Sequence, residues 1–152
     1  MNILVVEDDD EKSSHLTLFL SERLPAASVR HARSLQSGLR AIYELPPDLI
    51  FLDMTMRNFD VTIDEEGGRP HPFAGKEILR QMQRRNLQIP AIVVTHFVRF
   101  GDDDGFMTLE ELKKDLEERF PNYVGTVQFK SNVDSWKATL ADFLRQVTQI
   151  EG

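Results

Sequence analysis

Short apolar runs and segments of helical periodicity alternate along the whole chain. The runs at 3–6, 49–52 and 91–94 are almost entirely apolar. Such runs are typical of parallel strands that are buried on both faces of a sheet. Weaker strands are expected at 28–32 and 124–129. The pattern therefore predicts five strands.

Apolar residues recur every three or four positions in the intervening segments, which is the spacing of one helix face. Thr108 and Glu111 stand at capping-box spacing where one of these helices begins. Helices are expected over 11–24, 35–44, 76–86, 108–120 and 133–147. Five strands alternating with five helices predict an α/β fold, a doubly wound parallel sheet with helices on both faces.

Two connections are long for a compact domain. Residues 54–75 are rich in glycine, proline and acid, and residues 96–107 contain the run GDDDGF. Long loops of this kind are more often functional than idle. Neither a repeat nor a linker divides the 152 residues, so a single domain is expected over 1–152.

Composition narrows the function classes. With 25 acidic and 18 basic residues, the net charge of -7 argues against direct binding to nucleic acid. No apolar run approaches the ~20 residues that span a bilayer, so no membrane association is expected. The apolar run at the N-terminus is too short for a signal peptide, and cysteine is absent. A cytoplasmic protein without thiolate metal sites follows.

Polar residues stand where the predicted strands end. Glu7 and Asp8 follow the first strand, Asp53 follows the third, Thr95 ends the fourth and Lys130 follows the fifth. Ligands of open α/β sheets bind beyond the carboxyl ends of the strands. Neighbouring carboxylates stay ionised only with a cation between them, and dense oxygen ligands suit Mg²⁺. Asp53 could then be a nucleophile that forms an aspartyl phosphate, which Thr95 and Lys130 would stabilise.

These residues and their surroundings resemble the CheY-like receiver domain of two-component response regulators. The resemblance covers essentially the whole chain and implies a flavodoxin-like fold with strand order 2-1-3-4-5. The motifs that carry it are ILVVEDD at 3–9, PDLIFLDMTM at 47–56, GKEIL at 75–79, IPAIVVT at 89–95 and FK at 129–130.

The resemblance also implies roles for individual residues. Asp53 matches the phosphoacceptor, Thr95 the hydroxyl switch and Lys130 the phosphate-pairing lysine. The implied ligands of Mg²⁺ are Glu7, Asp8, Asp53 and the backbone carbonyl of Thr55. A receiver of this type is a signalling domain and not an enzyme, apart from self-phosphorylation and self-dephosphorylation. Its expected partners are a sensor histidine kinase or phosphotransfer protein and a separate downstream protein.

Three residues depart from the family pattern. Ser131 stands where a proline normally follows the lysine, and Val127 stands where an aromatic switch is usual. His96 replaces a small residue; it either narrows access to Asp53, hydrogen-bonds the phosphate, or simply faces solvent. These departures keep open an alternative function, a pseudo-receiver that binds partners without switching by phosphorylation.

Relative to the family, residues of about 57–74 and 96–107 are insertions. The alternation at 59–63, with glycines at 67–68, predicts a small hairpin beside Asp53. Residues 100–111 partly match a calcium loop, but Phe100 occupies its first ligand position. A polar loop that leads into a capped helix is the favoured interpretation of this second insertion.

Overall fold

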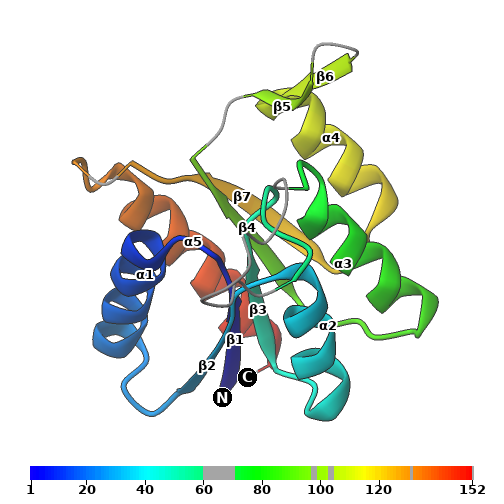
Figure 1. Ribbon diagram of the computed structural model, residues 1–152. Coiled ribbons are helices and arrows are strands. Elements are labelled where there is room, and N and C mark those ends of the chain that lie inside the picture. The colour runs from blue at the N-terminus through cyan, green and yellow to red at the C-terminus, as the bar shows by residue number, and fades with distance from the viewer. Residues whose placement is uncertain (60–70, 97–98, 103–104, 131, 152) are drawn as a thin grey trace, which may run out of the picture.

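Five parallel strands form one sheet in the described part of the chain (Figure 1). The computed structural model describes residues 1–59, 71–96, 99–102, 105–130 and 132–151. The sheet strands are β1 (Asn2–Val6), β2 (Ser28–Ala32), β3 (Leu49–Leu52), β4 (Ala91–Thr95) and β7 (Tyr123–Gln128). Their order is β2-β1-β3-β4-β7, and each neighbouring pair is parallel. Counted within this sheet, the order is the predicted 2-1-3-4-5, so the expected fold class is confirmed.

Helices cover both faces of the sheet (Figure 1). They are α1 (Asp10–Arg23), α2 (Leu35–Glu44), α3 (Ala74–Arg84), α4 (Leu109–Arg119) and α5 (Ser135–Glu151). Helices α1 and α5 pack on one face, while α2, α3 and α4 pack on the other. Alternate residues of a strand point to opposite faces. In β1, accordingly, Leu4 and Val6 belong to one core and Ile3 and Val5 to the other. None of the described helices is long and apolar enough to cross a membrane.

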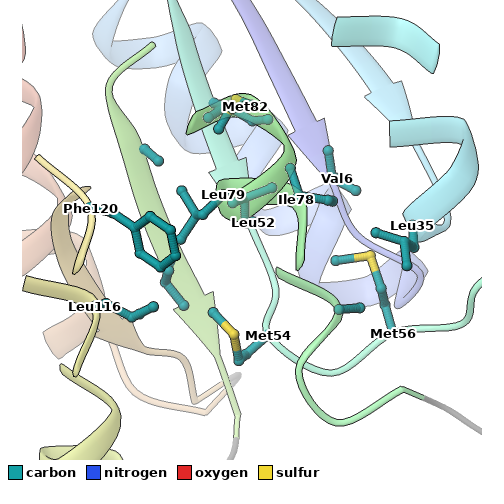
Figure 2. Packing of buried hydrophobic residues seen from close by; sticks show 14 of the residues in the cluster. Val6, Leu35, Leu52, Met54, Met56, Ile78, Leu79, Met82, Leu116 and Phe120 are labelled. Carbon is teal, nitrogen blue, oxygen red and sulfur yellow. The ribbon is translucent and has the colours of Figure 1, made fainter. Parts of the chain in front are cut away.

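The core under α2, α3 and α4 also fixes the chain directly after β3. Met54 and Met56 are fully buried there, among side chains such as Ile78 and Leu79 of α3 (Figure 2). Because these two side chains are held in the core, the backbone directly after Asp53 has little freedom. Packing therefore positions the residue that the sequence marks as a nucleophile.

The second long connection folds into a hairpin. Strand β5 (Arg99–Asp102) pairs antiparallel with β6 (Gly105–Thr108), and α4 begins directly afterwards. The expected loop is thus wrong for residues 99–102 and 105–107, which belong to this antiparallel strand pair. The capping box is confirmed, since Thr108 Oγ1 accepts the N–H of Glu111 at 3.2 Å and Glu111 Oε1 accepts that of Thr108 at 3.2 Å.

The first long connection is closed at its base. Met56 and His71 exchange two backbone hydrogen bonds, 3.2 Å from the Met56 N–H and 2.7 Å from the His71 N–H. The hairpin predicted from the alternation at 59–63 falls almost entirely on residues 60–70, which lie outside the described residues.

Candidate functional site

An acidic cluster lies at the carboxyl edge of the sheet. Glu7 follows β1 and Asp53 follows β3, and both are 4% exposed, whereas Asp8 is half-buried. One carboxylate oxygen of each residue lies within 4.8 Å of those of the other two. The structure thus brings together the three acidic side chains that the sequence assigns to one site.

A lysine from α1 lies between two of these acids, Glu7 and Asp53. Lys12 Nζ lies 2.8 Å from Asp53 Oδ2 and 2.9 Å from Glu7 Oε2, and the Lys12 side chain is 0% exposed. The same ammonium donates a hydrogen bond to the backbone carbonyl of Val94, at 3.1 Å. Three acceptors therefore match the three N–H donors of the ammonium.

Lys12 was missed by the sequence analysis, although its position in α1 carries a signal. Asp9 caps the helix, because its Oδ1 accepts the N–H of Glu11 at 3.0 Å and that of Lys12 at 3.4 Å. Lys12 stands four residues before Leu16, which is buried in the core under α1 and α5. Residues four apart share a helix face. A lysine at a core-facing position is the signal that could have revealed a buried cation.

The electrostatics of the cluster follow from burial and from a surplus of negative charge. Burial, followed by the charge of Asp53, raises the pKa of Glu7 to about 9, although Lys12 partly offsets both effects. Burial and Asp53 likewise raise the pKa of Asp8. Burial alone would lower the pKa of Lys12, but the attraction of Asp53 and Glu7 outweighs it, and the pKa is raised. The ammonium of Lys12 thus forms ion pairs with Glu7 and Asp53, and its charge also lowers the pKa of Asp8.

Backbone amides orient the same carboxylates. Met54 N–H donates to Asp53 Oδ1 at 2.7 Å, and Asp9 N–H donates to Glu7 Oε1 at 3.0 Å. Each of these two side chains consequently uses one oxygen for a backbone amide and the other for Lys12. Asp8 is held differently, because its Oδ2 accepts the N–H of Arg57 at 3.4 Å and it forms no ion pair with Lys12.

Close backbone packing also holds the segment after β3. The N–H of Gly75, at the start of α3, donates to the carbonyl of Met54 at 3.1 Å. A Cβ atom at Gly75 would lie only 2.5 Å from the carbonyl oxygen of Asp53. Thr55 Oγ1 donates to the carbonyl of Pro72 at 3.2 Å. This segment is thus held against residues 72–75. The role of the Thr55 carbonyl as a metal ligand stays a prediction.

The other two predicted site residues lie in different surroundings. Thr95 ends β4 and is 0% exposed, at the same edge of the sheet as the acids. The side chain of Lys130 is exposed and forms no ion pair with a carboxylate in the described part of the chain. Its role as the phosphate-pairing lysine stays a prediction, and Ser131 lies outside the described residues.

His96 bridges the end of β4 and the start of α1. Its Nε2 lies 3.0 Å from Asp9 Oδ2, and its ring meets the ring of Phe129 edge-on, with centroids 5.1 Å apart. Burial alone would raise the pKa of Asp9, but hydrogen bonds from His96 and from two backbone amides of α1 lower it. His96 is partly exposed yet paired, an arrangement that the sequence analysis did not consider.

Val127 fills the position at which the family carries an aromatic switch. It is 1% exposed and belongs to the core under α1 and α5. The nearby Tyr123 belongs instead to the opposite core, and its hydroxyl is hydrogen-bonded to Thr126 Oγ1. Burial raises the pKa of Tyr123. A buried valine has no polar group that could form a hydrogen bond with groups of the site.

Known proteins of similar length and fold resemble this chain. No family model matches it. The uncharacterised protein y4jR of Sinorhizobium fredii (strain NBRC 101917 / NGR234) is 32% identical over 143 residues, which cover 92% of this chain and 94% of that protein. The Detocs response regulatory protein DtcB of Enterobacter cloacae (strain JD6301) is 28% identical over 153 residues, covering 99% of this chain and all of DtcB (100%).

Solved structures agree with these relatives. The CheY-like response regulator receiver domain from Methanospirillum hungatei JF-1 matches with a TM-score of 0.64 at 18% identity, over 99% of this chain and 95% of that one. The fold of this chain is that of CheY-like response-regulator receiver domains. The names of DtcB and of the Methanospirillum hungatei structure describe those proteins as a response regulatory protein and a response regulator receiver domain. The resemblance seen in its motifs is thereby confirmed.

Proposed function

We propose that this receiver takes a phosphoryl group on Asp53 from a sensor histidine kinase or a phosphotransfer protein. A separate downstream protein then reads the changed surface. The observation that carries the proposal is the buried Asp53 carboxylate at the carboxyl end of β3, grouped with Glu7 and Asp8. A carboxylate in such a setting is a competent nucleophile toward phosphorus. We further propose that residues 1–152 form one receiver-like domain, with insertions at about 57–74 and 96–107.

The acidic residues fit a divalent cation. Glu7, Asp8 and Asp53 offer hard oxygen ligands, with one atom of each inside a 4.8 Å cluster, and their charge exceeds that of Lys12. Mg²⁺ prefers such oxygen ligands and keeps several waters. We propose that these side chains and the backbone carbonyl of Thr55 hold it. The ion would supply positive charge that neutralises the acids and the incoming phosphoryl oxygens.

The transfer step uses groups of this chain. A lone pair of an Asp53 carboxylate oxygen forms the new bond to phosphorus. The bond between phosphorus and the donor's nitrogen or oxygen breaks, and its electron pair leaves with the donor. We propose that the hydroxyl of the buried Thr95 donates a hydrogen bond to a phosphoryl oxygen of the product. Apart from this transfer and the later self-dephosphorylation of Asp53, the receiver catalyses no reaction.

Mass spectrometry tests the phosphoacceptor directly. The wild-type chain would be incubated with Mg²⁺ and acetyl phosphate, and in parallel with beryllofluoride. An adduct is expected on the wild type and on Asp48→Asn, but not on Asp53→Asn or in the presence of EDTA. Asp48 is the matched control, because it lies at the opposite end of β3, where it accepts the N–H of Asn2 at 2.7 Å.

Fluorescence gives a second readout of the same experiment. The ring of Trp136 lies 5.1 Å from that of Phe129, which in turn donates its backbone N–H to the Thr95 carbonyl at 2.8 Å. We therefore expect beryllofluoride to change the Trp136 emission of the wild type but not that of Asp53→Asn. Absence of any Asp53-dependent adduct would support the pseudo-receiver alternative, in which the fold binds partners without accepting phosphate.

A further inference from the structure

Two lysines of this receiver are candidates for pairing with a phosphoryl group, and they differ in placement. Lys12 is buried between Glu7 and Asp53, where its Nζ contacts Asp53 Oδ2 at 2.8 Å. Lys130, which the family motif marks, is exposed and has no carboxylate partner among the described residues. The ammonium that touches the nucleophile therefore comes from α1 and not from the end of β7.

We propose that Lys12 is the cation that pairs with Asp53 and with the phosphoryl group bound to it, the role that the motif assigns to Lys130. This inference rests on the proposed phosphorylation of Asp53. It makes Lys12 a catalytic residue, since its ammonium touches the carboxylate that reacts.

Helix α1 and the strand ends hold the ammonium in this place. Asp9 fixes the first turn of α1, and Leu16, one turn beyond Lys12, anchors the same helix face in the core. The ammonium contacts Glu7 at 2.9 Å and the Val94 carbonyl at 3.1 Å besides Asp53. It is thus held by β1, β3 and β4 together. An ammonium that is already in position pays no reorganisation when charge develops beside it.

Transfer of the phosphoryl group adds negative charge at Asp53, which a neighbouring ammonium stabilises. The Asp53 carboxylate carries one negative charge, whereas the phosphoryl group on the aspartyl phosphate carries up to two. The phosphoryl oxygens are then added to a cluster that already contains Glu7 and Asp8. Hydrogen bonds between an ammonium and such oxygens are charge-assisted and strong. Lys12 Nζ is within hydrogen-bond distance of one of the two possible attacking oxygens.

The test compares rates of Asp53 phosphorylation by acetyl phosphate with Mg²⁺ in Lys12→Met, Lys12→Arg and Lys130→Met. Lys137→Met is the surface control, because Lys137 lies on α5, where its ammonium is 3.5 Å from Asp134 Oδ1 and 5.7 Å from the centroid of the Trp136 ring. Removing one preorganised charge-stabilising donor lowers a rate by about 100-fold or more. We expect a loss of that size in Lys12→Met, a partial recovery in Lys12→Arg, and a loss in Lys130→Met at least about tenfold smaller.

The possible outcomes separate the two proposals. If the wild type is phosphorylated and Lys130→Met loses more than Lys12→Met, the role of Lys12 is overturned while Asp53 remains the phosphoacceptor. If Lys12→Met keeps the wild-type rate, the role of Lys12 is likewise overturned. A wild type without an Asp53-dependent adduct refutes both proposals.

A second measurement avoids the case in which Lys12→Met does not fold. In the wild-type chain labelled with ¹⁵N at lysine, the Nζ signals of Lys12 and Lys130 are assigned from Lys12→Arg and Lys130→Arg. We expect beryllofluoride with Mg²⁺ to shift the Lys12 signal more than the Lys130 signal. A shift confined to Lys130 would overturn the assignment, whatever the variants do.

Discussion

Replacing Lys12 by methionine should destabilise the folded receiver strongly. Methionine keeps the length and apolar stem of the side chain but removes the ammonium, so the change isolates the charge. Lys12 is 0% exposed, and the side chains of Glu7 and Asp53 are 2% and 4% exposed. Removing one partner of a buried ion pair costs about 3–5 kcal/mol, because the remaining charge is left uncompensated. We expect a loss of this size at pH 8.

The size of the loss should depend on pH, with a sign that the pKa shifts fix. The pKa of Lys12 is raised above 10.5, so the ammonium stays charged in the folded and unfolded chain below pH 9. The pKa of Glu7 is raised from 4.5 to about 9, so the folded state binds more protons than the unfolded state between these values. Stability therefore falls as pH rises through this window. The charge of Lys12 lowers the pKa of Glu7, so removing it makes protonation of Glu7 in the folded state still more favourable. The loss of unfolding free energy in Lys12→Met should therefore be smaller at pH 5 than at pH 8.

Urea unfolding in EDTA-containing buffer measures these differences, since the chelator removes any contribution from a bound cation. The variants are Lys12→Met, Asp53→Asn and the double variant, with Lys137→Met as an exposed control. The two site residues are in contact, so we expect a coupling free energy of about 1–3 kcal/mol. An unfolding free energy of Lys12→Met within about 0.5 kcal/mol of the wild-type value at pH 8 would show that the remaining carboxylates need no compensating ammonium. Additive losses in the double variant would contradict a direct interaction between Lys12 and Asp53.

Three further changes probe other parts of the structure. Gly75→Ala should destabilise by about 1–3 kcal/mol in urea unfolding, because its Cβ would lie 2.5 Å from the Asp53 carbonyl oxygen; unchanged stability would mean that α3 can shift freely. In His96→Ala the pKa of Asp9 should rise toward its ordinary value in an NMR titration of carboxyl carbons, since one of the hydrogen bonds that lower it is lost. Asp115 has a pKa lowered by its bonds to cations of α3 and α4 against the opposing effect of burial, so its stabilisation exists above the unfolded pKa and is lost as pH falls. Asp115→Asn should accordingly lose about 0.5–1 kcal/mol at pH 7 and less at pH 3, and an equal loss at both pH values would contradict the ion pairing.

Most elements of the fold could be predicted from local sequence patterns. The apolar runs at 3–6, 49–52 and 91–94 became β1, β3 and β4, because a strand buried on both faces needs apolar side chains at every position. The capping box at the start of α4 was visible for the same reason, since its two residues are three positions apart. The β5–β6 hairpin was missed: a short antiparallel pair that stands outside the main sheet leaves little periodicity in the sequence.

The site was predictable to the extent that strand ends are predictable. Once the strand order is known, residues that follow β1 and β3 must lie side by side, and the grouping of Glu7 and Asp8 with Asp53 follows from it. Side-chain partners are a different matter. His96 contacts Asp9 across 87 positions, a pairing that depends on how the end of β4 lies over the start of α1.

By itself, the sequence determined the alternation of strands and helices, the two cores and the acidic edge of the sheet, because these depend on residue spacing within single elements. Only the tertiary structure decided which cation meets Asp53. Lys12 is 41 positions from Asp53 and 82 from Val94, and α1 reaches both only because it packs across the face of the assembled sheet. A buried ammonium is stable only where acceptors from several strands converge on it. That convergence is a property of the folded chain.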